Sequence, residues 1–353
     1  MMKQSDIDRL LDWYAAGHRD LPWRKDREPY HVWISEIMLQ QTRVEAVRGY
    51  YTRFLDALPR VEDLASAPEE LCRKLWEGLG YYSRIRNAQR AARQIVQTGH
   101  FPETFEELRA LPGVGDYTAG AIASICFEQP TPAVDGNVLR VWARVEADER
   151  PMNDAKVKKE VARALQPLYR PGRCGDTTQA LMELGATVCV PSGAPRCESC
   201  PLRGSCRALQ DGRTAELPVK QEKKTRRVEE MTVFLLRCED RIALRKRPET
   251  GLLAELWELP NVPGRLSLDE ALRRAEAWEL HPDAPERIVE EKHIFTHVEW
   301  KMRAVSIACK SAADAFVWVT AKELEQGFAL PTAFRKLLGQ GKTSSESAGR
   351  SLS

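Results

Sequence analysis

The sequence predicts two domains of different fold class: an all-α domain of two lobes over residues 1–216 and an α+β domain over residues 231–338. Three observations support this division. Apolar residues recur at helical spacing up to about residue 210, whereas short β-rich runs begin at residue 231. Between them, residues 217–230 contain five cations and almost no large apolar side chain, which is typical of a linker. The length of 353 residues also fits two domains.

The first domain is predicted to consist of amphipathic helices separated by Gly and Pro. The first helix places Ile7, Leu10 and Tyr14 on one face. The same periodicity predicts further helices over 32–55, 68–79, 83–98, 104–111, 117–127, 138–145, 154–168 and 177–188. These helices have no repeating unit, so they indicate a bundle of two lobes and not a repeat array.

The second domain is predicted to mix strands with helices. The β-rich runs are MTVFLLR, RIALRKR, ERIVEEKHIF and KMRAVSIA, and the helices lie over 268–278 and near 333–338. This mixture indicates an α+β module. The last residues, 339–353 (GQGKTSSESAGRSLS), are mostly small and polar, so we predict a disordered tail.

The composition excludes several classes of protein. With 43% hydrophobic and 29% charged residues, the chain is not wholly disordered. No stretch approaches the ~18 apolar residues of a membrane span, and the first residues include acids where a signal peptide would be apolar. We therefore expect a cytoplasmic protein. The net charge of +2 is too small to indicate a polyanionic partner by itself.

Four of the nine cysteines lie within eighteen residues, at the end of the helical domain. In a cytoplasmic chain, such a group indicates a metal or iron–sulfur site before it indicates disulfides. Four thiolates can bind a [4Fe–4S] cluster or a tetrahedral zinc ion, and the spacing alone does not choose between them. The predicted ligands are Cys189, Cys197, Cys200 and Cys206.

The segment LPGVGDYTAG places Gly113 and Gly115 in a tight turn between two predicted helices. Such a turn directs backbone N–H groups and a helix N-terminus toward one point, which suits a phosphate group. An ordinary helix–helix turn would have the same glycines. Asp116 would repel a phosphate, which tempers the first interpretation.

Two carboxylates are candidates for acid–base chemistry. Glu36 lies among apolar residues in WISEIMLQQT, where desolvation would raise its pKa toward that of a general acid. A first-turn glutamate that faces water is the commoner alternative. Asp135 precedes a predicted helix beside Gly136 and Asn137, so it is also a candidate N-cap.

Taken together, these motifs resemble those of a known family. LPGVGDYTAGAI, VDGNV and the four cysteines are similar to the helix-hairpin-helix superfamily of DNA glycosylases that includes endonuclease III. WISEIMLQQTRV, GLGYYSR and the linked second domain narrow the resemblance to adenine DNA glycosylases of the MutY type. The resemblance spans residues 7–338. It implies a helix-hairpin-helix glycosylase domain with a [4Fe–4S] cluster in the loop 189–206, then a Nudix-like (MutT-like) domain.

The resemblance implies a monofunctional enzyme that hydrolyses the N-glycosidic bond of adenine mispaired with 8-oxoguanine or guanine, after the base is flipped out of the duplex. Glu36 would protonate a ring nitrogen of adenine, and Asp135 would stabilise or attack the oxocarbenium-like sugar. Tyr117 and Asn137 would complete the catalytic set. The implied partner is double-stranded DNA with these mispairs. We expect a monomer, located in the cytoplasm with the nucleoid.

The resemblance also assigns residues that recognise DNA. Gln41 and Thr42 would enter the duplex and contact 8-oxoguanine, and Tyr81 would wedge beside it. The remaining DNA-recognition positions are Arg24 in the adenine pocket, Gly113 and Gly115 at a phosphate, and Phe295, Thr296 and His297 on the 8-oxoguanine strand. The helix over 268–278 offers only Glu270 and Glu276, too few for the magnesium site of a MutT-type hydrolase, so we expect a recognition domain.

The sequence departs from the family pattern in the cluster loop and in the second domain. Seven residues separate Cys189 from Cys197 where the family usually has six, so this loop must bulge. Thr296 replaces the usual serine and keeps its hydroxyl.

Two other functions were weighed against adenine excision. A bifunctional glycosylase and AP lyase of the endonuclease III type needs an amine nucleophile. Tyr117 stands at the position of that lysine, and no lysine occurs between Lys74 and Lys156. A catalytically silent DNA-binding protein is the second alternative, and the presence of both Glu36 and Asp135 argues against it.

Overall fold

The computed structural model describes residues 1–219 and 225–339, and its contacts divide the chain into two units. The first unit contains Met1–Ala67 and Ser83–Glu222, and the second contains Pro68–Tyr82 with the remainder of the chain from Lys223. Residues 220–224 of the predicted linker and residues 340–353 of the predicted tail lie outside the described residues. Within the described ranges, no helix is long and apolar enough to cross a membrane.

The first unit is helical, as its periodicity predicts. Its α-helices are α1 (Gln4–Gly17), α2 (Pro29–Leu39), α3 (Val44–Ala57), α4 (Val61–Ser66), α6 (Ser83–Thr98), α7 (Phe105–Ala110), α8 (Asp116–Phe127), α9 (Gly136–Glu146), α10 (Ala155–Leu165), α11 (Cys174–Thr187) and α12 (Arg207–Gln210). Short 3₁₀ turns occur at η1 (Pro22–Arg24), η2 (Gln166–Leu168), η3 (Cys197–Ser199) and η4 (Arg203–Ser205).

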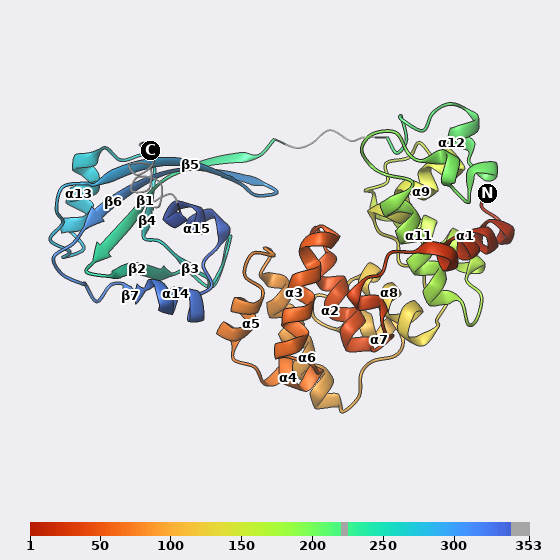
Figure 1. Ribbon diagram of the computed structural model, residues 1–353, viewed down its shortest axis with the longest axis horizontal. Helices are drawn as coiled ribbons and strands as arrows, with labels where there is room; N and C mark the ends of the chain where they lie inside the picture. The colour runs from red at the N-terminus through yellow and green to blue at the C-terminus, as the bar shows by residue number, and fades with distance from the viewer. Residues whose placement is uncertain (220–224, 340–353) are drawn as a thin grey trace, which may run out of the picture. The chain divides into compact units, whose positions relative to one another are not determined.

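The helices of this unit pack in two groups (Figure 1). In one group α2 contacts α3 and α8, α4 contacts α6, and α7 contacts α8. In the other group α11 lies between α1 and α9 around a core that includes Leu10, Val141 and Leu184. Helix α8 also packs on α11 and so joins the two groups. The candidate carboxylates are on α2 and before α9, on either side of this junction.

A glycine allows two of these helices to approach closely near Asp135. A Cβ atom at Gly185 of α11 would lie 2.6 Å from Cβ of Asn137 in the first turn of α9. Any larger residue at 185 would therefore push the start of α9 away from α11. The position of Asp135 at the head of α9 depends on this contact.

One predicted helix is two helices in the structure. The pattern over residues 32–55 is interrupted by a turn between Leu39 and Val44, which separates α2 from α3. At this turn Gln41 has a φ of 59°, in the left-handed region that non-glycine residues rarely adopt. The predicted duplex-entering residues Gln41 and Thr42 are therefore in a tight turn, not inside a helix.

The second unit has a mixed sheet with helices on both faces. Its strands are β1 (Arg227–Cys238), β2 (Arg241–Lys246), β3 (Trp257–Glu258), β4 (Asn261–Pro263), β5 (Arg287–Ile294), β6 (Val298–Ala308) and β7 (Val317–Thr320). Its helices are α5 (Glu69–Leu75), α13 (Leu268–Glu276), α14 (Ala321–Gly327) and α15 (Thr332–Gly339). Strand β1 begins at Arg227, within the segment that the sequence predicts as linker.

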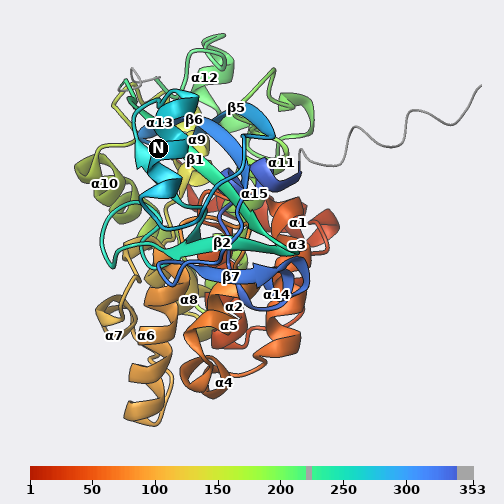
Figure 2. The ribbon, with the colours of Figure 1, turned by 90° about the vertical axis from the view of Figure 1, so that its left-hand side faces the viewer.

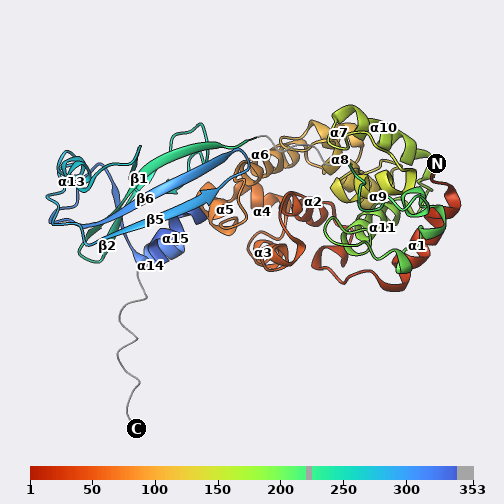
Figure 3. The same cartoon turned by 90° about the horizontal axis from the view of Figure 1, so that it is seen from above.

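The sheet has the order β3-β2-β1-β6-β5, with β4 paired to β1 and β7 paired to β2. Strands β2 and β7 lie side by side in Figure 2. β1 and β6 are parallel, and the other pairs are antiparallel. Alternating residues of β1 point to opposite faces. Val233 and Leu235 pack in the same core as residues of α14 and α15, whereas Phe234 packs in a core with α13, so the helices cover both faces (Figure 3).

Candidate functional site

Glu36 is a buried carboxylic acid held by a tyrosine. It lies on α2 with 5% of its surface exposed, and its Oε2 accepts a 2.5 Å hydrogen bond from the hydroxyl of Tyr117 on α8. Burial raises the pKa of Glu36 to about 7; the charge of Asp135 adds to the rise, and the Tyr117 hydrogen bond opposes it. Burial also raises the pKa of Tyr117 well above 10, so this hydroxyl remains a donor. Glu36 can therefore be protonated near neutral pH.

Asp135 is the N-cap of α9, as its sequence context predicts. Its Oδ1 accepts a 2.8 Å hydrogen bond from the backbone N–H of Val138, and its Oδ2 accepts a 2.7 Å bond from Nδ2 of Asn137. Burial raises the pKa of Asp135, and these two hydrogen bonds act in the opposite direction. The two acids are close enough for the charge of Asp135 to act on Glu36. Glu36, Tyr117, Asp135 and Asn137 thus form one site.

Arg24 lies beside this site but is occupied by a carboxylate that the sequence motifs do not identify. Its Nη2 donates a 2.9 Å bond to Oε2 of Glu183 on α11, and Arg19 donates to the same carboxylate at 2.7 and 2.8 Å. Burial alone raises the pKa of Glu183, but the two arginines outweigh burial and hold it at about 2. Arg24 therefore presents to Glu36 a charge that is largely paired.

The glycine hairpin ends at the N-terminus of α8. Gly113 has a φ of 78°, which favours glycine, and a Cβ there would lie 2.7 Å from Cβ of Asn87 on α6. Gly115 is the N-cap of α8. Asp116 forms an ion pair with Arg109, so its charge is balanced within the hairpin. The hairpin amides remain a candidate anion site on these grounds.

The predicted recognition residues of the second unit are on its surface. Tyr81 is 44% exposed with a φ of 48°, and its hydroxyl hydrogen-bonds that of Thr296. Thr296 and His297 are exposed in the turn between β5 and β6. Phe295 is half-buried, with its ring 4.8 Å from that of Trp300 in an edge-to-face contact. Phe295 therefore packs on the sheet, while the two polar residues face outward.

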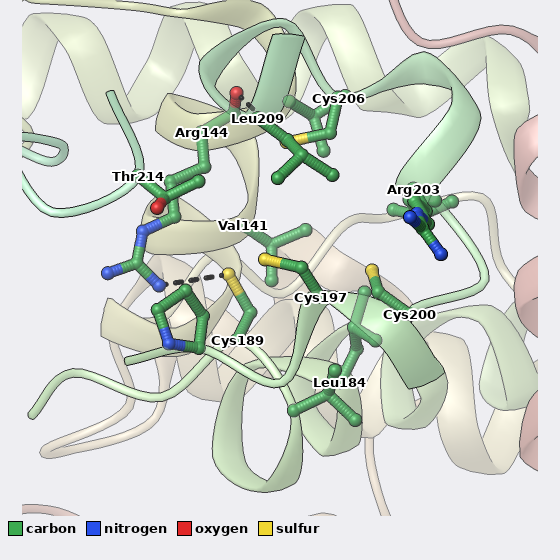
Figure 4. Close-up of a pocket in the computed structure, with 14 residues that line it drawn as sticks. Val141, Arg144, Leu184, Cys189, Cys197, Cys200, Arg203, Cys206, Leu209 and Thr214 are labelled. Atoms are coloured by element: carbon green, nitrogen blue, oxygen red, sulfur yellow. Dashed lines mark hydrogen bonds between the residues drawn. The ribbon is translucent and has the colours of Figure 1, made fainter. Parts of the chain in front are cut away.

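The four cysteines line one pocket with Arg144 and Arg203 (Figure 4). All four are free thiols. The loop from Cys189 is closed by the 2.9 Å bond from the N–H of Arg196 to the carbonyl of Val188, and Gly193 turns within it at a φ of 76°. The extra residue of this loop is thus accommodated in a turn.

The chemistry of this pocket fits a bound cationic centre. Burial raises the pKa of three of the thiols, that of Cys200 to about 11, and the neighbouring cysteines add to each rise. Arg144 donates a 3.3 Å hydrogen bond to Sγ of Cys189. In the described ranges, no group of three or more His, Cys, Asp or Glu side chains converges closely enough to hold a single metal ion. The pocket presents four free thiols, the donor type that both a zinc ion and an iron–sulfur cluster bind.

Arg140 connects the cysteine pocket to the carboxylates. Its Nε donates a 2.6 Å bond to the carbonyl of Cys189, and its Nη2 donates a 2.8 Å bond to Oδ1 of Asn137. Asn137 in turn donates to Asp135. This continuous path runs along α9, and no sequence motif marks Arg140.

Comparison with known proteins places the chain in a family. The HhH-GPD superfamily of base excision DNA repair proteins matches residues 34–171, and the NUDIX domain matches residues 232–340. An adenine DNA glycosylase of Rattus norvegicus is 38% identical, with 93% of this chain and 76% of that protein covered. The chain belongs to the adenine DNA glycosylase family.

As an adenine DNA glycosylase, the chain is a base excision repair enzyme that hydrolyses N-glycosyl bonds. Its helical unit is similar to a thermostable thymine-DNA glycosylase (TM-score 0.54, 27% identity, 59% of this chain and 96% of that chain). It is also similar to endonuclease III in a non-covalent DNA complex (TM-score 0.51, 25% identity, 60% and 99%). These findings confirm the predicted family and the predicted combination of folds.

In this adenine DNA glycosylase, the sequence motifs do not identify Glu183, Arg19 or Arg140. All three act through partners distant in sequence: Glu183 is 159 residues from Arg24, and Arg140 is 49 residues from Cys189. A polar residue on the otherwise apolar run of α11 was the available signal for Glu183.

Proposed function

We propose that this enzyme excises adenine opposite 8-oxoguanine, and less readily opposite guanine, from the double-stranded DNA of the nucleoid. The observation that supports it best is the site of Glu36, Tyr117 and Asp135, which offers one protonatable and one hydrogen-bonded carboxylate. Two such acids suit departure of a base from an oxocarbenium-like sugar. The names of the relatives give adenine as the base.

In the proposed reaction, adenine is flipped out of the duplex into the site. Glu36 gives its proton to a ring nitrogen, so the base leaves neutral. Asp135, held by Val138 and Asn137, stabilises the positive charge on the sugar or bonds to it, and water completes the hydrolysis. Tyr117 holds Glu36 and has no amine with which to form a Schiff base with the sugar.

Single-turnover assays on four duplexes test the proposal. The duplexes have A:8-oxoguanine, A:G, A:T, and an oxidised pyrimidine opposite purine. We expect rapid release of adenine from the first, slower release from the second, and no strand cleavage without added base. A borohydride-trapped adduct with the oxidised pyrimidine would favour the bifunctional alternative. Tight binding with no base release would favour the silent DNA-binding alternative.

The pH dependence of the single-turnover rate should report the ionisation of Glu36. Because the acid must be protonated, the single-turnover rate should fall about tenfold per pH unit above the pKa of about 7. In Tyr117→Phe, loss of a donor to the carboxylate raises the pKa of Glu36, so the fall in rate should begin at a higher pH. Tyr50→Phe on α3 is the matched control. If the rate of Tyr117→Phe began to fall at the same pH as in the wild type, or at a lower pH, the hydrogen bond between Tyr117 and Glu36 would not control this pKa.

We propose that Cys189, Cys197, Cys200 and Cys206 bind a [4Fe–4S] cluster. A tetrahedral zinc ion draws four sulfurs to about 2.3 Å from one point. An iron–sulfur cluster has its own volume and bonds one thiolate per iron, which suits four thiols that line one pocket. The likeness to endonuclease III supports the same choice. Bound there, the cluster would chiefly hold the loop 189–206 in place.

Metal analysis of the purified protein is expected to give four irons per chain and a brown colour. Stoichiometric zinc should be absent, because the cluster would use all four thiolates. Cys200→Ser should lower the iron content, while Cys238→Ser in the second unit should not. One tightly bound zinc per chain, with no iron, would refute the cluster.

For the second unit we propose recognition of the strand opposite adenine. Thr296 and His297 are exposed hydrogen-bonding residues, and Glu270 is engaged by Ser267 in a helix cap at 2.7 Å, not directed to a metal. In His297→Ala, the rate ratio of A:8-oxoguanine to A:G should fall about fivefold, at the low end of one base contact. Asp314→Ala, also exposed in this unit, should leave the ratio intact. If the ratio were unchanged in both variants, His297 would have no part in recognising the strand opposite adenine.

A further inference from the structure

The turn that contains Gln41 and Thr42 is fastened to α6 by one arginine. Nη1 of Arg84 donates hydrogen bonds to the carbonyls of Ile37 at 2.6 Å, Met38 at 3.2 Å and Gln40 at 2.7 Å. These are among the last carbonyls of α2 and the residue after it, which lack helical partners. A guanidinium at this end of a helix is also favoured by the helix dipole.

This turn needs external support because its backbone is strained. Gln41 has a φ of 59°, in the left-handed region where the Cβ of an L-residue lies too close to the following carbonyl oxygen. Within the turn itself, the N–H of Thr42 donates to the carbonyl of Leu39 at 3.2 Å. The side chain of Gln40 donates to Thr118 of α8 at 3.3 Å. Arg84 therefore supplies the shortest of the hydrogen bonds that hold the backbone just before Gln41.

The other arginines of the same helix differ from Arg84. Arg86, Arg90 and Arg93 are exposed on α6, and Nε of Arg93 donates a 3.2 Å hydrogen bond to the carbonyl of Ala65. Arg84 is half-buried and directed at the end of α2. In the sequence, residues 83–93 hold these four arginines and no acid, a pattern typical of a cationic stripe that contacts phosphates. The structure uses Arg84 inside the unit, so its charge acts on α2 and not on a nucleic-acid backbone.

We propose that Arg84 is a positioning residue that sets the shape of the Gln41–Thr42 turn and thereby the preference for the base opposite adenine. This inference rests on the proposed function. Glu36 lies on the same helix, but its carboxylate is held separately by Tyr117. Loss of Arg84 should therefore alter the choice of opposite base more than it alters proton transfer.

The test compares Arg84→Gln and Arg84→Lys with Arg90→Gln, a change of the same kind on the exposed side of α6. In Arg84→Gln, we expect the single-turnover rate ratio of A:8-oxoguanine to A:G to fall about tenfold, because charge-assisted hydrogen bonds are lost. Arg84→Lys should recover part of this ratio, since the ammonium can still reach a carbonyl. The pH above which the single-turnover rate falls, which reflects the pKa of Glu36, should be the same in all of these variants.

Hydrogen exchange of the full-length protein gives a second readout that does not need activity. The amides at residues 41–43 should exchange faster in Arg84→Gln and not in Arg90→Gln. Unchanged exchange there overturns the inference, and so does faster exchange with an unchanged rate ratio. Equal loss on both duplexes also overturns it, since that indicates a structural role alone. If the wild-type enzyme releases no adenine from either duplex, the proposed function fails, and with it the specificity role of Arg84.

Discussion

Glu36→Gln is expected to lower adenine release about a thousandfold while duplex binding stays close to that of the wild type. Glutamine keeps the shape of the side chain and can still accept the hydrogen bond from Tyr117, but it has no proton to give. General acid catalysis typically contributes 10²–10⁴-fold to a rate. Single-turnover release from an A:8-oxoguanine duplex measures the loss, and fluorescence anisotropy measures binding.

Glu106→Gln on α7 is a suitable control, because this glutamate is exposed in the first turn of its helix. It should release adenine at the wild-type rate. Release by Glu36→Gln within tenfold of the wild type at neutral pH would show that another group donates the proton. Loss of binding together with release would instead indicate damage to the pocket.

Asp135→Asn is expected to slow release about 10²–10³-fold, because the neutral amide cannot balance the positive charge that develops on the sugar. Asp135 has two roles, since it also caps α9 through Val138. Asparagine is about as good an N-cap as aspartate, so the helix should survive the substitution. The melting temperature and the rate should therefore respond differently.

The chain offers a matched control for this second substitution. Asp154 caps α10 by accepting a 2.7 Å bond from the N–H of Lys156, and Asp154→Asn makes the same chemical change at a cap far from Glu36 in sequence. It should keep full activity. A wild-type rate for Asp135→Asn would contradict the electrostatic role of this carboxylate. A large fall in the melting temperature of Asp135→Asn would instead attribute the loss of rate to a weakened helix cap.

Helical periodicity and local motifs were sufficient for most of the helical unit. The spacing of Ile7, Leu10 and Tyr14 predicts α1, and all three are buried in the structure. Glu36 and Asp135 could be found because each has an unusual local neighbourhood, apolar for one and a helix start for the other. Such signals lie within a few residues along the chain.

The features that the sequence did not predict depend on contacts between distant residues. The break after α2 contains neither Gly nor Pro, so no turn residue marks it in the sequence. Arg84, more than forty residues later, holds the strained turn at Gln41. The partners of Glu183, Arg19 and Arg24, are known only from the fold, since α11 brings the carboxylate to them. Residues 68–82 read as part of the helical domain, yet their contacts group them with the second unit.

The burial of Glu36 also affects the folding equilibrium. A glutamate in the unfolded chain loses its proton near pH 4.5, whereas in the fold the pKa is about 7. Between these values the native state binds more protons than the unfolded state, so the free energy of unfolding decreases as the pH rises. The decrease amounts to about 3 kcal/mol above pH 7, a large share of the 5–15 kcal/mol typical of a domain. The helical unit must therefore hold, through its other contacts, a residue whose ionisation favours the unfolded chain.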